Sequence, residues 1–562
     1  MNSGHQKLWP GLLRSLVILI FAEAFAVGQL PLASMRLAGY CMVGYSMVGY
    51  SMVGHVHAAA RSGTPPGTEL REQVRAYRVA NERQIIADFT RFLQIPNLAS
   101  DVPNIRRNAE AIIAMMKARQ IETNLLEVPG APPVVFGELN TPGAKSTITF
   151  YAHYDGQPVD PTQWQNSPWS PVLRPAGPGG SEAGIDPTSA AAPLDPESRI
   201  YARSASDDKA PIICFMAALD ALRAAHIPLS VNLRFFLEGE EEAGSPHLQA
   251  LLDKYSDRLH TDVWILCDGP VHQSHRMQVF FGARGTTDLE MTVYGPNRGL
   301  HSGHYGNWAP NPIVLLTHLL DTMRDADGRI LIPGFYDDVR PLTAQERRAL
   351  SEMPNVDEDL KKELGLAWTE GGVTPLAEEI LKPALNVRGI QGGHVGRQAA
   401  NVISSEASAS IDFRLVPDQT LERVRRLVDD HIAKQGFFIV RETPDAAVRL
   451  GHPRIIKLHW GAGYPAARTP MDLPASRAVV EVIERTIGQP IVKMPGLGGS
   501  IPMYLFEGTS HTAVIGVPIA NYDNNQHSAN ENIRLQNLWE GIEIFAGLFA
   551  GLGSSLSPVP VH

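Results

Sequence analysis

The stretch Leu237–Pro246 reads LEGEEEAGSP and follows directly on the apolar run Val231–Leu237 (VNLRFFL), which predicts a buried strand. It holds four carboxylates within five residues: Glu238, Glu240, Glu241 and Glu242. Crowded carboxylates at the end of a buried strand are costly unless a cation or water neutralises them. Two interpretations are open at this point, a metal site or a solvated acidic turn.

Helical segments and short apolar runs alternate on both sides of this stretch. The predicted helices are 69–93, 104–119 and 209–225, and the predicted strands are 134–139, 147–151, 231–237 and 263–267. This alternation favours an α/β core with parallel strands. The segment Pro171–Pro196 is rich in Gly, Pro and Ala, which predicts an exposed insertion loop.

The pattern of expected helices and strands changes near Thr286. Strands are expected at 289–294, 408–415 and 437–442 and helices at 311–324 and 421–434, which indicates a small α+β domain. After about Gly461 the α/β pattern returns, with helices at 473–487 and 533–552 and a strand at 511–517. We therefore expect a catalytic domain in two parts, 66–285 and 461–552, interrupted by a domain at 286–460.

The 562 residues suffice for two or three domains, and the formal net charge of -10 argues against nucleic acid as the main partner. The three cysteines are Cys41, Cys214 and Cys267, and the last two stand in apolar runs. No disulfide framework is expected from them.

The first 60 residues predict a targeting segment. Lys7 and Arg14 precede the apolar stretch Leu16–Phe25, and a low-complexity repeat follows at Gly39–His55. This is the pattern of a secretory signal, so we expect a secreted or periplasmic protein whose leader is removed before Arg61. The alternatives are an uncleaved N-terminal membrane anchor and an internal start at Met35.

Polar residues stand at the strand ends and helix starts of the expected core. Asp155 follows His153 by two residues, and residues two apart on an extended chain point the same way, so Asp155 can hydrogen-bond the far nitrogen of His153. Two imidazoles and three carboxylates in such places suit a pair of zinc ions. The expected ligands are His153, Asp207, Glu242, Asp268 and His527.

Each motif alone also has an ordinary structural interpretation. His153 would be a satisfied core histidine, Asp207 a helix N-cap and Arg414 a surface ion-pair residue. LHSG at 300–303 would be a simple turn, and GGSIP at 498–502 the start of a helix that Ser500 caps.

Taken together, eight motifs resemble a known family. They are YAHYD (151–155), SDDK (206–209), EGEEEAGS (238–245), the Asp that ends VWILCD (263–268), LHSG, FRLVPDQ (413–419), GGSIP and HSANE (527–531). Over about residues 70–550 the chain resembles the di-zinc metallopeptidase family of carnosine dipeptidase, aminoacylase, succinyl-diaminopimelate desuccinylase and glutamate carboxypeptidase, and most of all its dipeptidase branch. The resemblance implies a zinc-exopeptidase-like three-layer α/β/α catalytic domain, interrupted by a smaller ferredoxin-like α+β domain that serves as lid and dimerisation domain.

The resemblance also implies a role for each ligand. His153, Asp207 and Asp268 would hold one zinc, and Asp207, Glu242 and His527 would hold the other, with Mn²⁺ or Co²⁺ as alternative metals. Glu241 would be the general base, and Asp155 would support His153. A cis peptide is implied between Asp207 and Asp208.

The substrate and dimer contacts are implied in the same way. His301 would stabilise the oxyanion from a partner subunit, and Asn401 would make a second contact across subunits. Arg414 would bind the free carboxylate of the substrate, and Gly499 and Ser500 would contact the same end.

Four positions depart from the family pattern. The run Tyr201–Ser204 replaces the usual Gly-Arg-Gly, Ala210 replaces a Gly, Gly496-Leu497 replaces an Arg-Glu pair, and Met471–Leu473 stands where a substrate-contacting His is expected. Because the ligand set is complete, these departures affect the identity of the substrate rather than hydrolysis.

We therefore expect an exported zinc hydrolase that cleaves the amide bond of dipeptides or N-acylated amino acids with a free carboxylate. The alternatives are an aminoacylase- or desuccinylase-type deacylase that uses the same site, and an inactive dimeric binding protein.

Overall fold

The computed structural model describes residues 67–175, 184–510 and 512–556. The N-terminal segment with its repeat and Cys41 lies outside these residues, as do 176–183 and His511. Within them, no helix combines the length and the apolar character that crossing a membrane requires. Cys214 and Cys267 are buried free thiols.

The core is an eight-stranded sheet with the strand order β1-β2-β6-β3-β7-β19-β8-β18. The central strands β6, β3, β7 and β19 are parallel, as expected for an α/β core. The bounds are β1 Glu122–Leu126, β2 Val134–Leu139, β3 Thr147–His153, β6 Asn232–Glu238, β7 Val263–Leu266, β8 Gln278–Phe280, β18 Val492–Met494 and β19 Ala513–Gly516.

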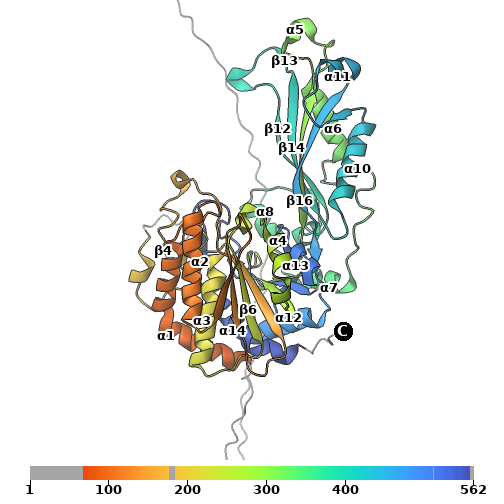
Figure 1. Ribbon diagram of the computed structural model, residues 1–562. Coiled ribbons are helices and arrows are strands. Elements are labelled where there is room, and N and C mark those ends of the chain that lie inside the picture. The colour runs from red at the N-terminus through yellow and green to blue at the C-terminus, as the bar shows by residue number, and fades with distance from the viewer. Residues whose placement is uncertain (1–66, 176–183, 511, 557–562) are drawn as a thin grey trace, which may run out of the picture. The chain divides into compact units, whose positions relative to one another are not determined.

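Helices cover both faces of this sheet (Figure 1). Neighbouring strand residues point to opposite faces, so Phe150 joins the larger core cluster while Tyr151 joins the smaller one. The first face carries α1 Gly67–Leu93, α2 Val102–Lys117, α3 Lys209–Ala224, α12 Pro474–Ile487 and α14 Leu535–Ser555. The second face carries α4 Leu248–Lys254 and α13 Met503–Ser510.

Helices α3 and α14 are apolar on nearly every side because they are buried among other helices. Most residues of each helix are buried, and Phe215 and Phe545 meet edge to face at a ring-centroid distance of 4.7 Å. The SDDK motif leads directly into α3, and HSANE precedes β20 and α14, so these buried helices anchor both motifs.

A second sheet of five strands has the order β12-β14-β10-β16-β15. Its first four strands and two helices follow the chain order β10-α6-β12-β14-α10-β16 with antiparallel pairing, which is the arrangement of a ferredoxin-like fold. The bounds are β10 Gly285–Tyr294, α6 Pro312–Met323, β12 Ala384–Gln391, β14 Glu406–Leu415, α10 Leu421–Lys434, β15 Phe438–Val440 and β16 Ile455–Tyr464.

Both helices of this domain pack on one face of its sheet. Leu289 and Phe413 belong to the cluster beneath the helices, whereas the alternate residues Thr286 and Arg414 point to the other face. This leaves one polar sheet face uncovered by α6 and α10.

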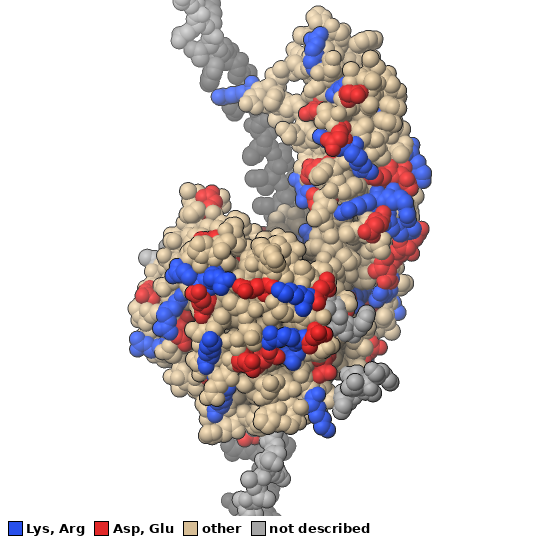
Figure 2. All heavy atoms as spheres, viewed as in Figure 1, with Lys and Arg blue, Asp and Glu red and all other residues tan. Residues whose placement is uncertain are grey.

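The remaining strands and α-helices of the described residues are short. They are β4 Val172–Arg174, β5 Arg199–Tyr201, β9 Gly282–Ala283, β11 Leu300–His301, α5 Ser302–Tyr305, α7 Ala344–Glu352, α8 Asp357–Glu363, α9 Leu376–Glu379, β13 Val402–Ile403, α11 Ala446–Gly451, β17 Ala467–Arg468 and β20 Asn532–Arg534. Basic and acidic side chains lie interspersed on the face shown in Figure 2.

The prediction of an exposed loop at Pro171–Pro196 is wrong for the ends of that segment. Leu173 and Leu194 are buried in the main core, and the backbone N–H of Leu194 donates to the Glu82 carboxylate of α1 at 3.0 Å. The Gly and Pro content concealed these two buried leucines, and Leu194 attaches its end of the segment to α1.

Candidate metal centre and active site

The expected ligands lie at the carboxyl edge of the central strands. Strand β3 ends at His153, a 3-10 turn at Glu241–Ala243 follows β6, and Asp268 follows β7. Because these three strands are parallel and adjacent, their carboxyl ends meet at one edge of the sheet.

Asp207 links two histidines that are more than 350 residues apart in the chain. His153 Nε2 lies 2.9 Å from Asp207 Oδ1, and His527 Nε2 lies 3.3 Å from Asp207 Oδ2. His527 Nε2 also lies 3.3 Å from Glu242 Oε2. One carboxylate therefore faces both imidazoles, which is the position that a bridging ligand needs.

Two overlapping groups of side chains offer ligand atoms that all lie within 4.8 Å of one another. One group is His153, Asp207 and Glu242, and the other is His153, Glu241 and Asp268. The structure thus brings the five expected ligands and the expected general base into one cluster, in which Glu241 lies as close to His153 and Asp268 as a ligand would.

The electrostatics of the cluster suit bound cations. Burial, together with the charge of Asp207, raises the pKa of Glu242 to about 8 and that of Asp268 to about 6. Burial opposes ionisation of Asp207 as well, yet hydrogen bonds with His153 and His527 hold its pKa well below the usual range. The buried His153, the exposed His527 and the crowded carboxylates between them are a donor set that suits divalent zinc.

The peptide between Asp207 and Asp208 is cis, as the resemblance implies. Asp207 is not a helix cap, because the residue before α3 is Asp208 and its side chain makes no capping hydrogen bond. His153 is fully buried, but carboxylates surround it rather than a purely apolar core.

Asp155 lies beside the imidazole, as expected. Its Oδ1 is 3.3 Å from His153 Nδ1, and its two oxygens accept the backbone N–H groups of Glu241 at 3.1 Å and Glu242 at 3.0 Å. Asp155 therefore positions the acidic turn as well as the imidazole.

Glu531, for which the sequence predicted no role, holds the loop that carries Asp207. Its carboxylate accepts the backbone N–H groups of Ser206 and Asp207, each at 3.0 Å, and pairs with the buried Arg203 at 2.8 Å. Glu531 ends the HSANE motif and Arg203 lies in the run that departs from the family pattern, so their positions in motifs were the available signal.

Two glutamines that the sequence analysis also missed contact the ligands. Gln157 donates to Glu242 Oε2 at 2.6 Å, and Gln526 donates to Asp207 Oδ2 at 2.9 Å. Gln526 directly precedes His527, whereas no pattern singled out Gln157.

The other two carboxylates of the opening stretch have structural partners. Glu238 accepts from the Tyr151 hydroxyl at 2.7 Å, and Glu240 lies 2.9 Å from His247 Nδ1. Both carboxylates are buried, so the interpretation as a solvated acidic turn is wrong for them.

His301 and Asn401 lie next to each other in the ferredoxin-like domain. His301 pairs with Val402 in a two-stranded ladder, and the N–H of Ser302 donates to Asn401 O at 2.8 Å. Both residues are exposed, and no hydrogen bond or ion pair within the described residues joins them to the metal ligands. LHSG is a strand-to-helix corner in which His301 Nδ1 accepts from Gly303 at 3.1 Å.

Arg414 and Ser500 contact each other. Arg414 Nη1 donates to Ser500 Oγ at 2.8 Å, and Arg414 Nε pairs with Asp412 at 3.0 Å. Ser500 does not cap a helix, because α13 begins at Met503. Arg414 does form an ion pair, but it also reaches the GGSIP loop that contains Gly499.

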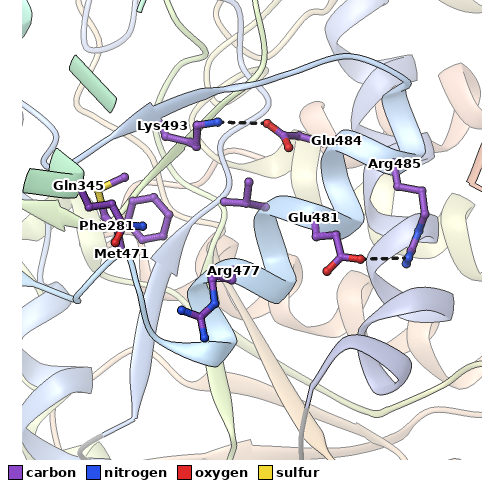
Figure 3. Close-up of a pocket in the computed structure, with 9 residues that line it drawn as sticks. Phe281, Gln345, Met471, Arg477, Glu481, Glu484, Arg485 and Lys493 are labelled. Atoms are coloured by element: carbon purple, nitrogen blue, oxygen red, sulfur yellow. Dashed lines mark hydrogen bonds and ion pairs between the residues drawn. The ribbon is translucent and has the colours of Figure 1, made fainter. Parts of the chain in front are cut away.

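A separate open pocket lies next to α12 (Figure 3). Ion pairs of Lys493 with Glu484 at 3.3 Å and of Arg485 with Glu481 at 3.6 Å occupy its wall. Met471, where the resemblance predicts a substrate-contacting His, lines this pocket. None of the metal ligands lines it, so it is not the candidate active site.

The chain is similar to known proteins in sequence and in fold. The chain is 30% identical over 431 residues to the Beta-Ala-His dipeptidase of Homo sapiens, covering 74% of this chain and 77% of that protein. It is 26% identical to the Cys-Gly metallodipeptidase dug1 of Schizosaccharomyces pombe, covering 86% of this chain and 98% of that one. The crystal structure of Sso-CP2, an M20 family metallo-carboxypeptidase from Sulfolobus solfataricus, matches with a TM-score of 0.67 and 28% identity over 84% of this chain and 99% of that one.

The family model for peptidase family M20/M25/M40 matches residues 149–550, a range that begins in β3 and ends in α14. That range contains all the proposed metal ligands together with Glu241 and Arg414. The chain therefore belongs to peptidase family M20/M25/M40 and is a metallopeptidase.

Proposed function

We propose that the chain is a di-zinc exopeptidase that hydrolyses the amide bond of dipeptides, with N-acylated amino acids as a related class, when the substrate has a free carboxylate. The observation that carries the proposal is the position of Asp207 between His153 and His527, with Glu241, Glu242 and Asp268 beside it. The related Beta-Ala-His and Cys-Gly dipeptidases support dipeptides as the substrate class.

Zinc fits the donor set, and the ligands would divide between two ions. His153 and Asp268 would hold one ion, Glu242 and His527 the other, and Asp207 would serve both. When bound, the two ions would polarise the scissile carbonyl and lower the pKa of the attacking water.

Glu241 would act as the proton shuttle. It lies in the cluster beside His153 and Asp268, and burial raises the pKa of its carboxyl well above the usual value, as a group that takes and returns a proton requires. It would accept a proton from the water and pass it to the leaving amine. Its backbone N–H donates to Asp155, which fixes the backbone from which the Glu241 side chain extends.

The carboxylate of the substrate would bind to Arg414 near Ser500 and Gly499. A guanidinium presents paired donors that match a carboxylate, and Arg414 already reaches this loop through Ser500. With its carboxylate bound there, the substrate would present its amide bond to Glu241 and the metals.

The ferredoxin-like domain, at about 286–460, would serve as lid and dimer interface. His301 and Asn401 are exposed in one corner of it, and β12 is an edge strand with exposed Val387 and Ile390. A partner chain that covers these residues would bring its own His301 to the oxyanion of this chain's site.

Export of the protein is part of the proposal and rests on the sequence of residues 1–60 alone. The basic residues Lys7 and Arg14 and the apolar stretch Leu16–Phe25 support a cleaved leader. N-terminal sequencing of the protein from culture medium or periplasm would test it.

A substrate panel tests the activity directly. Metal-free protein would be reconstituted with zinc, manganese or cobalt and given free dipeptides, N-acetyl amino acids and N-succinyl amino acids. We expect metal-dependent hydrolysis with the highest kcat/KM on dipeptides. Faster turnover of the N-acyl compounds would replace the dipeptidase assignment by a deacylase, and no turnover with any metal would contradict both.

A further inference from the structure

Arg284 contacts the same loop as Arg414. It lies between β9 and β10, its Nε donates to Gly498 O at 2.8 Å and its backbone N–H donates to Gly499 O at 3.3 Å. The next residue, Ser500, accepts from Arg414. Two arginines therefore hold three consecutive residues of the loop expected to contact substrate.

The strand register places both guanidinium groups on one face of the sheet. Arg414 on β14 is directly opposite Thr286 on β10, and Arg284 precedes Thr286 by two residues. Residues two apart share a face, so Arg284 continues β10 as the diagonal neighbour of Arg414. This is the polar face that α6 and α10 leave uncovered.

The two arginines differ in their charge partners. Arg414 is paired with Asp412 at 3.0 Å, whereas Arg284 has no ion pair within the part of the chain that the structure describes. Burial, together with the nearby charge of Arg414, lowers the pKa of Arg284 to about 10, so it remains protonated at neutral pH. The pair of arginines thus carries one positive charge that no neighbouring carboxylate balances.

Tyr464 connects these arginines to the proposed proton shuttle. It lies opposite Thr286 on the third strand, β16, and therefore on the same sheet face. Burial and the charge of Glu241 raise the pKa of its phenol.

We propose that Arg284 is a specificity-determining residue that supplies the unbalanced positive charge for the free carboxylate of the substrate, while Arg414, paired with Asp412, orients that carboxylate. The inference rests on the proposed function and assigns its requirement for a free carboxylate to a residue: Arg284 makes the enzyme prefer free acids to the matching C-terminal amides. An anion that loses its hydration shell here needs such a charge, because Asp412 already offsets that of Arg414.

The test compares a dipeptide with its C-terminal amide, using zinc-loaded wild type, R284Q, R284K and the exposed-residue control R107Q. We expect R284Q to reduce the kcat/KM preference for the free acid about 10- to 100-fold, mainly through KM, because a hydrogen bond to a charged group is lost. R284K keeps the charge and should keep most of the preference, and R107Q should match wild type. Thermal unfolding and zinc content show whether each variant is folded and loaded.

The outcomes separate the inference from the proposed function. An R284Q enzyme that keeps the wild-type preference overturns the inference alone. An equal loss on acid and amide, in R284Q and R284K alike, also overturns it, because a residue that only holds the loop would act in that way. A wild type that hydrolyses no dipeptide overturns the proposed function and, with it, this inference.

Discussion

The Asp155 carboxylate accepts a hydrogen bond from the backbone N–H of Glu241 at 3.1 Å. Its other oxygen accepts the N–H of Glu242 at 3.0 Å, and the first lies 3.3 Å from His153 Nδ1. One buried side chain, Asp155, thus positions two proposed ligands, His153 and Glu242, and the proposed proton shuttle, Glu241.

Replacing Asp155 by Asn should lower activity without removing the fold. The amide keeps the size of the side chain and one acceptor oxygen, but it loses the negative charge beside His153 and one of the two N–H acceptors. Changes next to metal ligands typically cost about 10- to 100-fold in metal affinity or activity, and we expect a loss of that size. Zinc titration and kcat together would measure it. The matched control is D160N on the exposed loop after β3, which should behave as wild type.

Zinc binding at pH 7 should release at least two protons. In the metal-free chain, burial raises the pKa of Glu242 to about 8, and the hydrogen bond to Asp207 raises that of His527 to about 9, so both groups carry a proton at pH 7. A ligand must lose its proton to bind zinc, so affinity should increase as pH rises toward about 9 and decrease as pH falls.

Calorimetric titration with zinc in buffers of different ionisation enthalpy measures this release. The observed enthalpy should depend on the buffer at pH 7 and depend on it less at pH 9.5, where Glu242 and most of His527 are deprotonated before zinc arrives. An enthalpy independent of buffer at pH 7 would show that these two groups are not ligands.

Mixing two inactive variants tests whether His301 acts across subunits. If it does, a heterodimer of H301A and E241Q chains has one site with an intact Glu241 and an intact His301. Random exchange makes half of the dimers mixed, and each has one working site of two, so about a quarter of wild-type activity should return. If His301 acts within its own chain, or the chain is a monomer, mixing restores nothing. Sedimentation analysis of the mixture provides the control for exchange.

The core of the candidate site was predictable because its residues adjoin strong local signals. His153 and Asp268 directly follow apolar β-rich runs, and Asp207 precedes an apolar helix, so a strand or helix assignment already places them at one sheet edge. The eight motifs then identified the family, and the family description implied the cis peptide at Asp207.

What the sequence did not reveal depends on contacts between distant segments. Glu531 and Arg203 are 328 residues apart and meet only in the folded chain. Arg284 looks like an ordinary charged residue until its bonds to Gly498 and Gly499 are seen. The ends of Pro171–Pro196 were misjudged because composition does not show whether a leucine within a Pro-rich segment meets the core.

Several strands of the ferredoxin-like domain were missed for a different reason. Most residues of β12 are exposed, and β16 contains Gly461 and Gly463. Neither strand therefore shows the regular alternation of buried and exposed residues that β14 shows. Their identity as strands comes from pairing with β14 and β10, which is information that a local pattern does not contain.

The central claim is that Glu241 moves the proton while its neighbour Glu242 binds metal. The most direct measurement is steady-state kcat on the best dipeptide, together with zinc content, for E241Q and for E240Q as the control from the same acidic turn. We predict that E241Q keeps its zinc but loses about 100- to 10,000-fold in kcat, as expected when a general base is removed. E240Q, whose side chain faces His247, should keep most of its turnover. An E241Q enzyme with wild-type turnover, or one that loses its zinc along with its activity, would contradict the account.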